Sequence, residues 1–228
     1  MKKIRFGIVA CIHGNEKIGL EAIKILAKMN PENAQLKFII ANKLAIKLDK
    51  RFIDEDLNRV FPGKSDGNHE ERLAVEILHE LKDCDYVLDI HSTTANQEHA
   101  IIITRKNLDI LDLATRIPLR KVIIMGPSIA GYKSLIDYVK QGISIEFNQN
   151  EDPERVAQII RSYIRNLKNR TRQSSQEIYL VYGSLPRQGN LLLENFKRTR
   201  LGGETFYPIF YGEKEYEKIW CMKAKRIR

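Results

Sequence analysis

The sequence predicts an α/β protein, in which a mixed or largely parallel sheet is flanked by helices and followed by a small β-rich subdomain. Two observations support this fold class. Apolar runs of strand length alternate with segments of helical period through most of the chain. The length of 228 residues suits one domain, with or without a small appendage, and it is enough to bury a substantial core without disulfide staples.

Each predicted element follows from a local pattern. Apolar runs of strand length lie at residues 4–10, 36–42, 86–91, 99–104, 121–125 and 142–148. Helical periodicity lies between them, at residues 17–29, 71–83, 107–117 and 152–167. In the last of these helices Asp152 is a favourable N-cap and Pro153 a favourable first residue, so this helix is expected to close the main domain.

The C-terminal part of the chain has a different pattern. Residues 168–176 are polar and poorly patterned, which predicts a boundary near residue 172 and divides the chain into residues 1–172 and 173–228. Short β-prone runs separated by Gly and Pro follow at residues 177–183, 189–196, 204–211 and 218–227. This pattern predicts a small β subdomain.

Charge and cysteine content limit the partners and the compartment. Lys and Arg exceed Asp and Glu by 38 to 29, but the basic residues are interleaved with acids except at 165–172 and 223–228. We therefore expect a solvated basic surface that attracts small anions at most, and neither nucleic acid nor a membrane as partner. Three scattered cysteines do not form a disulfide framework, so a cytoplasmic location is predicted, with Cys11 packed in the core.

The N-terminus resembles a signal peptide only faintly. Its apolar run, residues 6–12, is seven residues long and leads straight into His13 without a small-residue cleavage site. We interpret this run as part of the first buried strand. No run in the sequence approaches the ~18 apolar residues that a membrane helix requires.

Four side chains that can bind a metal or move a proton fall at or near one edge of the predicted sheet. His13 and Glu16 follow the first strand, His91 closes the third, and Glu146 lies late in the sixth. Two imidazoles and one carboxylate leave a fourth position open, as in hydrolytic zinc sites, and Glu146 is then the candidate proton shuttle. Asp89 shares a strand face with His91 and is placed to fix the tautomer of its ring.

Each of these residues also has a structural interpretation. His13 and Glu16 alone could be a polar pair at a helix entrance. His91 alone could be a hydrogen-bonded residue at the end of a strand. Glu146 is different, because an acid inside an apolar strand is costly to bury without a partner, which favours a functional or paired role.

A second polar stretch, residues 51–63, mixes charged and apolar side chains. One interpretation is an amphipathic surface turn. In the other, Arg51, Asn58 and Arg59 form a clamp for a carboxylate and an oxyanion, because guanidinium groups bind carboxylates in bidentate fashion and stay charged. The residue types alone leave both open.

The order of the motifs resembles one family. "HGNE", "RFIDEDLNR", "LDIHSTT" and "ISIEF", with the C-terminal "LGGETFYPIFYGEKEYEK", resemble the aspartoacylase and succinylglutamate desuccinylase family, which has a zinc-carboxypeptidase-like fold. The resemblance implies one zinc ion per chain, a small-molecule N-acyl amino acid as substrate and a tendency to self-associate. It also implies the zinc ligands, which are His13, Glu16 and His91.

The resemblance extends to the catalytic and substrate-binding residues. Glu146 matches the acid/base glutamate, and Arg51 matches the arginine that polarises the scissile carbonyl. The residues that match the substrate pocket are Asn58 and Arg59, which would hold the carboxylate of the amino-acid product, and Tyr132 and Tyr216. The sequence therefore predicts a zinc-dependent amidohydrolase. The alternatives are a metallocarboxypeptidase that acts on peptide C-termini and a basic binding module with a vestigial site.

One position departs from the family pattern. Aspartoacylases have an arginine ten residues before the acid/base glutamate, which reads the aspartate side chain, and Ile136 stands there in this chain. Lys133, Lys140 and Arg105 are the candidate replacements. The acyl group and the amino acid of the substrate stay open.

Overall fold

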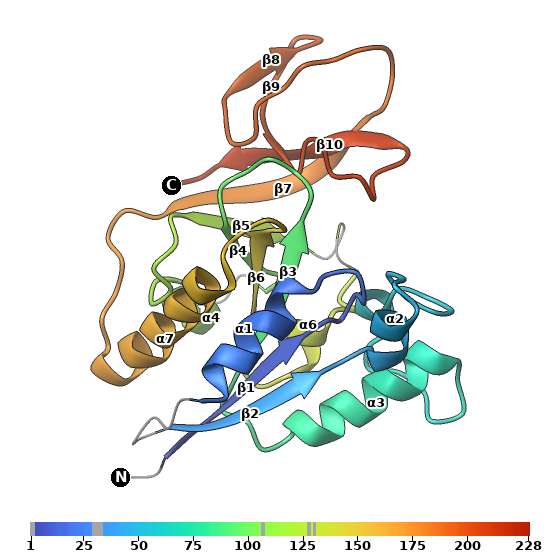
Figure 1. Ribbon diagram of the computed structural model, residues 1–228. Helices are drawn as coiled ribbons and strands as arrows, with labels where there is room; N and C mark the ends of the chain where they lie inside the picture. The colour runs from blue at the N-terminus through green and yellow to red at the C-terminus, as the bar shows by residue number, and fades with distance from the viewer. Residues whose placement is uncertain (1–2, 29–33, 106–107, 127–128, 130) are drawn as a thin grey trace.

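The computed structural model describes residues 3–28, 34–105, 108–126, 129 and 131–228. Within them one ten-stranded sheet has the order β2-β1-β3-β6-β4-β5-β7-β10-β9-β8 (Figure 1). The strands are β1 Ile4–Ala10, β2 Ala34–Ile40, β3 Tyr86–Thr93, β4 Ala100–Ile103, β5 Lys121–Met125, β6 Gly142–Asn148, β7 Glu177–Pro186, β8 Thr199–Leu201, β9 Glu204–Ile209 and β10 Ile219–Arg226. The helices are α1 Ile18–Leu26, α2 Lys43–Lys47, η1 Leu57–Arg59, α3 His69–Leu81, α4 Leu108–Ala114, α6 Leu135–Tyr138 and α7 Pro153–Asn169.

The sheet is mixed, as predicted. Strand β1 lies between β2 and β3, and both pairings are parallel. Strand β6 is parallel to β3, whereas β4 runs antiparallel to β6 and parallel to β5. The carboxyl ends of β1, β3 and β6 therefore meet at one edge of the sheet, where a ligand crevice is expected.

Helices cover both faces of the sheet (Figure 1). Helices α1, α4 and α7 pack on one face through a core that includes Ile23, Leu113 and Ile160. Helices α3 and α6 and the short η1 pack on the other face, through Ile77, Leu135 and Leu57. Because both faces are covered, the central strands are apolar on both sides, which explains their continuous apolar sequences.

The predicted elements agree with the structure through residue 169, with shifts of a few residues at their ends. Asp152 caps α7 by accepting a hydrogen bond from the Glu154 N–H at 3.0 Å, with Pro153 at the first helical position. Met29 and Asn107, at the ends of two predicted helices, lie outside the described residues. None of the described helices is long and apolar enough to cross a membrane.

The predicted β-prone run at 189–196 is wrong as a strand. The structure has no strand there, and Leu192 is 95% exposed. Phe196, by contrast, is buried and packs against Tyr179 of β7. The run contains apolar residues but has no neighbouring strand with which to form a ladder.

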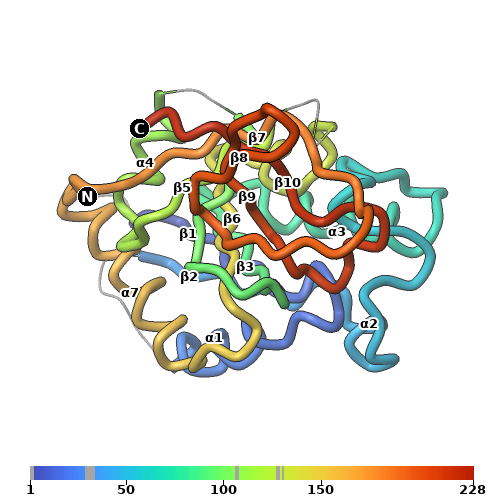
Figure 2. The backbone as a smooth tube through the Cα atoms, turned by 90° about the horizontal axis from the view of Figure 1, so that it is seen from above, coloured from blue at the N-terminus to red at the C-terminus, as the bar shows by residue number. Residues whose placement is uncertain are grey.

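The C-terminal segment continues the central sheet. Strand β7 pairs in parallel with β5, and β10 then pairs antiparallel with β7 and β9. The view from above, together with Figure 1, places these strands over the end of the sheet where β3 and β6 finish (Figure 2). The division of the chain near residue 172 stays a prediction, but the segment beyond it is positioned to reach that edge.

Candidate metal centre and active site

The structure brings most of the predicted site residues to one cavity of about 220 Å³ at the carboxyl edge of the sheet. His13 and Glu16 follow β1, and His91 and Glu146 are register partners on β3 and β6. The residues predicted for the site that line this cavity are His13, Glu16, Arg51, Asn58, Arg59, His91, Glu146 and Tyr216.

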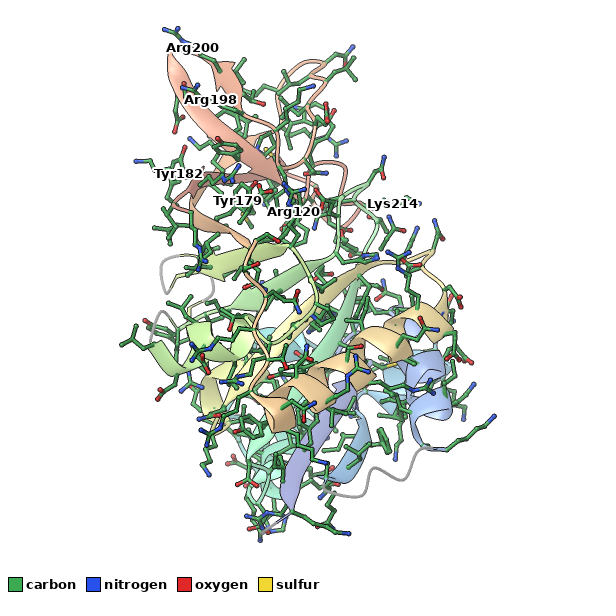
Figure 3. All side chains as sticks on the ribbon, turned by 90° about the vertical axis from the view of Figure 1, so that its left-hand side faces the viewer. Arg120, Tyr179, Tyr182, Arg198, Arg200 and Lys214 are labelled. Carbon is green, nitrogen blue, oxygen red and sulfur yellow. The ribbon has the colours of Figure 1, made fainter. Side chains whose placement is uncertain are left out.

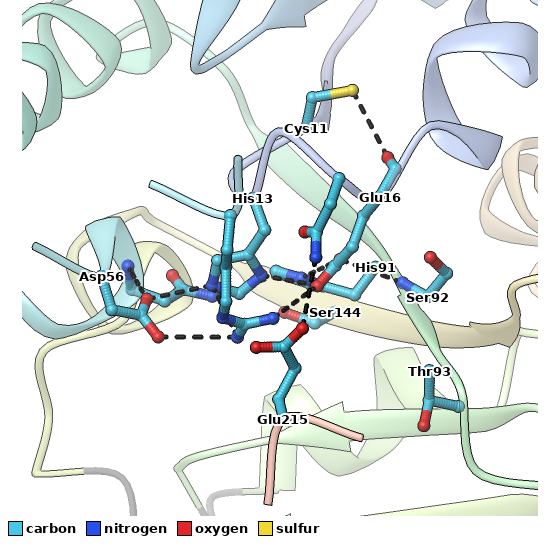
Figure 4. A network of polar contacts seen from close by, with 12 residues as sticks. Cys11, His13, Glu16, Asp56, His91, Ser92, Thr93, Ser144 and Glu215 are labelled. Atoms are coloured by element: carbon cyan, nitrogen blue, oxygen red, sulfur yellow. Dashed lines mark hydrogen bonds and ion pairs between the residues drawn. The ribbon is translucent and has the colours of Figure 1, made fainter. Parts of the chain in front are cut away.

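His13, Glu16 and His91 converge on one point. All three are buried, and the atoms that they offer to a metal lie within 4.8 Å of one another. The Glu16 carboxylate lies between the two rings, with Oε1 2.6 Å from His13 Nδ1 and Oε2 3.0 Å from His91 Nδ1 (Figure 4). Both imidazoles therefore turn the same ring nitrogen toward the shared point.

A second carboxylate stands behind each imidazole. His91 Nε2 lies 2.7 Å from Asp89 Oδ2, and His13 Nε2 lies 3.0 Å from Asp56 Oδ1. A ring that donates its Nε2–H to a carboxylate keeps the Nδ1 lone pair for a metal, which is the usual outer-shell arrangement at metal sites. Asp89 therefore has the contact expected from the sequence, and Asp56 has the matching contact on the other ring.

The electrostatics of this cluster favour positive charge. Burial lowers the pKa of His13 and His91, but the carboxylates around them outweigh burial, so both pKa values are raised. Burial likewise raises the pKa of Glu16, yet the two imidazoles hold it well below its ordinary value. Two nitrogens and one oxygen, backed by two more carboxylates, are a donor set that fits zinc.

Glu146 has the opposite electrostatic character. It lies on the cavity wall beside His91, and its carboxylate forms no hydrogen bond or ion pair with another described residue. Burial raises its pKa to about 8, and the Glu16 and Glu213 carboxylates add to this against the opposing effect of His91. A carboxyl group with a pKa near neutrality is suited to accept and return a proton.

Arg51, Asn58 and Arg59 enter the site from one loop. Arg51 reaches the centre, with Nη1 3.2 Å from Glu16 Oε1 and Nη2 3.5 Å from Asp56 Oδ2. Asn58 is buried, and its Oδ1 accepts a hydrogen bond from the Leu135 N–H at 3.1 Å. Arg59 is exposed at the cavity, where its guanidinium donates to the backbone oxygen of Asn58.

A buried carboxylate holds this loop in place. Glu70, at the start of α3, is fully buried and accepts hydrogen bonds from the backbone N–H groups of Ile53, Asp54 and Glu55 at 2.7 to 3.3 Å. Asn42 donates a fourth, at 2.9 Å. The loop between Arg51 and Asn58 is therefore fixed from below, which preorganises the side chains that it carries.

The C-terminal segment reaches the site through residues 210–217. Glu213 accepts hydrogen bonds from the hydroxyl groups of Thr93 and Thr94, two and three residues after His91. Glu215 accepts a hydrogen bond from Asn15 Nδ2 at 3.3 Å, and Asn15 lies between His13 and Glu16 in the chain (Figure 4). Tyr216 lines the cavity, and burial raises the pKa of its hydroxyl.

Other predicted site residues lie elsewhere. Tyr132 is 46% exposed, and it is not among the described residues that line the cavity. Lys140 pairs with Asp85, Arg105 donates to backbone oxygens of α6 and the residue after it, and Lys133 is exposed. None of these three cations lines the cavity as the structure describes it.

Sequence reasoning missed four residues that shape the site, namely Asp56, Glu70, Glu213 and Glu215. Asp56 lies inside the "RFIDEDLNR" motif, two residues before Asn58, and the position of Glu213 and Glu215 beside Tyr216 was an available signal. Glu70 gave no such signal, because it lies in an ordinary charged helix start. Its role depends on contacts with a loop about 16 residues away in the chain, at Asp54.

The mixed sheet with helices on both faces and the buried cluster of His13, Glu16 and His91 together define an α/β protein with a candidate metal centre. The chain belongs to the succinylglutamate desuccinylase/aspartoacylase family, whose catalytic-domain sequence model matches residues 3–170. This result confirms the resemblance seen in the motifs.

Individual relatives agree with the family. A probable aspartoacylase of Acaryochloris marina is 37% identical over 125 residues, which cover 47% of this chain and 41% of that protein. An N-acyl-aromatic-L-amino acid amidohydrolase (carboxylate-forming) B of Danio rerio is 27% identical over 169 residues, which cover 61% and 54%. The chain thus matches about half or less of the length of these curated relatives.

Solved structures support the fold over the whole chain. The crystal structure of murine aminoacylase 3 superposes with a TM-score of 0.82 at 20% identity, covering 100% of this chain and 96% of that one. At this identity the likeness concerns the fold. It includes the C-terminal segment, which the family's catalytic-domain match does not reach.

Proposed function

We propose that the protein is a zinc-dependent amidohydrolase that removes the acyl group from a small N-acyl amino acid. One observation carries the proposal: His13, Glu16 and His91 present their donor atoms to a single buried point, with Glu146 on the wall beside it. The names of the relatives, aspartoacylase and N-acyl-aromatic-amino acid amidohydrolase, support the same reaction class.

The protein's own residues divide the work of hydrolysis. Zinc, when bound to the triad, supplies Lewis-acid polarisation of a carbonyl and lowers the pKa of a water molecule to about 7. Glu146 accepts a proton from the attacking water and gives it to the leaving amine, so the acyl carbon gains a hydroxyl and the amide C–N bond breaks. Arg51 stabilises the negative charge that develops on the carbonyl oxygen.

Substrate binding is assigned to Arg59, Asn58 and Tyr216, which also line the cavity. Arg59 is exposed in the cavity and forms no salt bridge with any described residue, so its guanidinium is available to a substrate carboxylate. Asn58 is adjacent, with its Oδ1 accepting the Leu135 N–H and its amide nitrogen 3.2 Å from His91 Nε2, so it lies directly beside the centre. Tyr216 closes the cavity from the C-terminal segment.

The size of the cavity favours small substrates over peptides. A volume of about 220 Å³ is below the several hundred Å³ of sites for drug-sized ligands. The 210–217 loop, anchored by Glu213 on Thr93 and Thr94, lies at the cavity. The small cavity volume argues against a metallocarboxypeptidase, which must admit a peptide chain.

The proposal is tested by release of primary amine from N-acetyl and N-succinyl amino acids. We expect the zinc-loaded protein to hydrolyse at least one of them and the chelated protein to hydrolyse none. Hydrolysis of C-terminal residues from short peptides, with no release from the N-acyl panel, would support the carboxypeptidase alternative. Salt-sensitive RNA binding without hydrolysis would support the binding module.

A further inference from the structure

The names of the relatives imply different amino acids in the substrate, namely aspartate and aromatic amino acids. The residues that line this chain's own cavity therefore indicate which amino acid it accepts. We propose that the substrate is the N-acyl derivative of an apolar amino acid with one carboxylate, and that Ile136 and Met222 select its side chain. The inference rests on the proposed function and specifies the substrate of the same site.

One wall of the cavity is apolar. Starting from Glu146 on β6, this wall continues across the sheet through Ile102 of β4, Met125 at the end of β5 and Met222 of β10. Ile136 of α6 also lines the cavity. Two flexible methionines in such a wall can adapt to aliphatic and aromatic side chains of different shapes.

The hydroxyl groups on this wall are already used within the protein. Thr104 and Ser134 both donate to the carboxylate of Asp137, which follows Ile136 on α6. Ser144 is 3.3 Å from Asp89 Oδ2, to which it donates. A carboxylate in the substrate side chain would therefore find no free hydroxyl donor among Thr104, Ser134 and Ser144, and burying it there would be costly.

The charges around the cavity match a single carboxylate. Among the described residues that line it, the cations besides the imidazoles are Arg51 and Arg59. Arg51 is engaged by Glu16 and Asp56, which leaves Arg59 for the substrate. A second carboxylate, as in aspartate or glutamate, would have no free cation to pair with among these residues, and an unpaired buried charge is strongly disfavoured.

The contacts of Asn58 identify which part of the substrate meets the apolar wall. Asn58 Oδ1 accepts the Leu135 N–H at 3.1 Å, so one of the two residues proposed to hold the carboxylate touches α6 directly. Ile136 is the next residue of that helix. When the carboxylate binds at Arg59, the side chain on the same α-carbon is therefore the group nearest to Ile136.

The first experiment compares substrates on the zinc-loaded wild type. With acetyl as the common acyl group, we expect kcat/KM for N-acetyl-L-methionine, -leucine or -phenylalanine to exceed that for N-acetyl-L-aspartate by at least about 100-fold. With methionine as the common amino acid, lengthening the acyl group should have a much smaller effect. A preference that follows the acyl chain, or one for aspartate, would overturn the inference and leave the proposed function standing.

Two variants test the named residues. Ile136→Arg should raise the aspartate-to-methionine ratio of kcat/KM at least tenfold. Because Ile136 is buried and this variant can fail to fold, Met222→Lys, at a partly exposed position, places a cation on the same wall and should shift the ratio in the same direction. Leu192→Lys, a charge-matched control at a fully exposed position, should leave the ratio unchanged.

Binding gives a readout that does not depend on turnover. In zinc-loaded Glu146→Gln, calorimetry should show N-acetyl-L-methionine binding at least tenfold more tightly than N-acetyl-L-aspartate. If the wild type hydrolyses no member of the panel, the proposed function fails, and the calorimetric ratio still decides the inference. Equal affinities, or tighter binding of the aspartate derivative, would show it to be wrong.

Discussion

Two clusters of charged and titratable residues lie in this protein, and they shift the pKa of a glutamate in opposite directions. In the metal centre Glu146 has a pKa raised to about 8 by burial and by neighbouring carboxylates. Where the C-terminal segment joins the sheet, Glu177 at the start of β7 has a pKa lowered to about 2, chiefly by a hydrogen bond from Tyr179. The same side chain is thus poised to titrate in one place and locked as an anion in the other.

The second of these clusters, which we call the junction cluster, consists of Glu177 and four partners of its carboxylate, namely Arg120, Lys121, Tyr179 and Arg226. The Tyr179 hydroxyl donates to Glu177 Oε2 at 2.6 Å, and the Lys121 ammonium lies 3.2 Å from the same oxygen. Arg120 and Arg226 reach the carboxylate from either side, at 2.7 and 3.2 Å. A carboxylate with this many donors stabilises the protein, whereas the unpaired Glu146 is costly to stability and is explained by function.

The remaining cations of the C-terminal segment are dispersed. Figure 3 shows Arg198 and Arg200 toward the outer end of the segment and Lys214 well apart from them, near its junction with the main sheet. Tyr182 lies between Lys223 and Lys225, whose ammonium groups are 5.5 and 5.3 Å from its ring centroid. This spread agrees with the expectation of a solvated basic surface, which stays a prediction.

The largest expected effect concerns Glu146. Glu146→Gln should lower kcat by at least about 10³-fold, because it removes the group that moves the proton. Zinc should remain bound, since the triad is untouched. Near-normal activity would show that the acid/base assignment is wrong. Glu194→Gln, at an exposed glutamate that pairs with Lys197, is the matched control and should be fully active.

The same variant tests the raised pKa through stability. The folded chelated protein holds the Glu146 proton between the ordinary pKa of 4.5 and about 8, so its stability falls as pH rises through that window. Gln does not titrate. The melting temperature of Glu146→Gln relative to wild type should therefore rise between pH 5 and pH 8, and a difference independent of pH would contradict the raised pKa.

At the junction we expect a loss of stability instead. Glu177→Gln should lower the free energy of unfolding by about 3 kcal/mol, toward the lower end for breaking a buried ion pair. A lowered folded pKa stabilises above the ordinary value of 4.5, so the deficit should hold from pH 7 to pH 5 and shrink as pH falls toward 2. Urea unfolding at these pH values measures it. Activity at 25 °C should change little. A large loss of kcat would contradict the assignment of Glu177 to stability and not to catalysis.

A smaller effect is expected behind the metal ligands. Asp89→Asn should weaken zinc binding about 10- to 100-fold, because the carboxylate orients His91 through its Nε2 at 2.7 Å. Ser144→Ala removes a longer contact to the same oxygen, 3.3 Å, and serves as the control with a smaller effect. Competition with a chromophoric chelator measures both affinities. Equal zinc affinities in wild type and Asp89→Asn would show that Asp89 does not orient His91 for zinc binding.

The smallest effect links the two regions, since Tyr216 belongs to the same C-terminal segment as Glu177. Tyr216→Phe should raise KM about fivefold with little change in kcat, because it removes one neutral hydrogen bond to the substrate, which contributes about 1 kcal/mol to binding. Tyr182→Phe, whose hydroxyl donates to Glu204 instead, should leave KM unchanged. No difference between the two variants would mean that the segment does not contribute this side chain to substrate binding.

Local sequence was sufficient to place His13, Glu16 and His91 together at one edge of the sheet, whereas their role as metal ligands stays a prediction. They could be placed together because His13 and Glu16 closely follow β1 and His91 lies near the end of β3, and the carboxyl ends of parallel strands meet at a sheet edge. Ile136 was also noticed by its spacing from Glu146, and the structure places it in the cavity wall.

Long-range contacts could not be predicted. The parallel pairing of β5 with β7 joins segments about 56 residues apart, from Lys121 to Glu177, and no local pattern encodes it. The loop held by Glu70 has the composition of a surface turn, and its conformation follows from four hydrogen bonds to one distant carboxylate. The prediction of a strand at 189–196 was wrong for a related reason: these residues have β propensity but no partner strand, and without one they do not join a sheet.

The central claim is that a zinc ion held by His13, Glu16 and His91 is required for hydrolysis of an N-acyl amino acid. The most direct test titrates zinc into the chelated wild type and into His91→Gln while amine release from N-acetyl-L-methionine is followed. We expect wild-type activity to rise in proportion to the fraction of protein with zinc bound and to saturate at one zinc per chain. We expect His91→Gln to bind zinc weakly and to stay inactive. Full activity in the chelated protein, or undiminished zinc-dependent activity in His91→Gln, would contradict this claim.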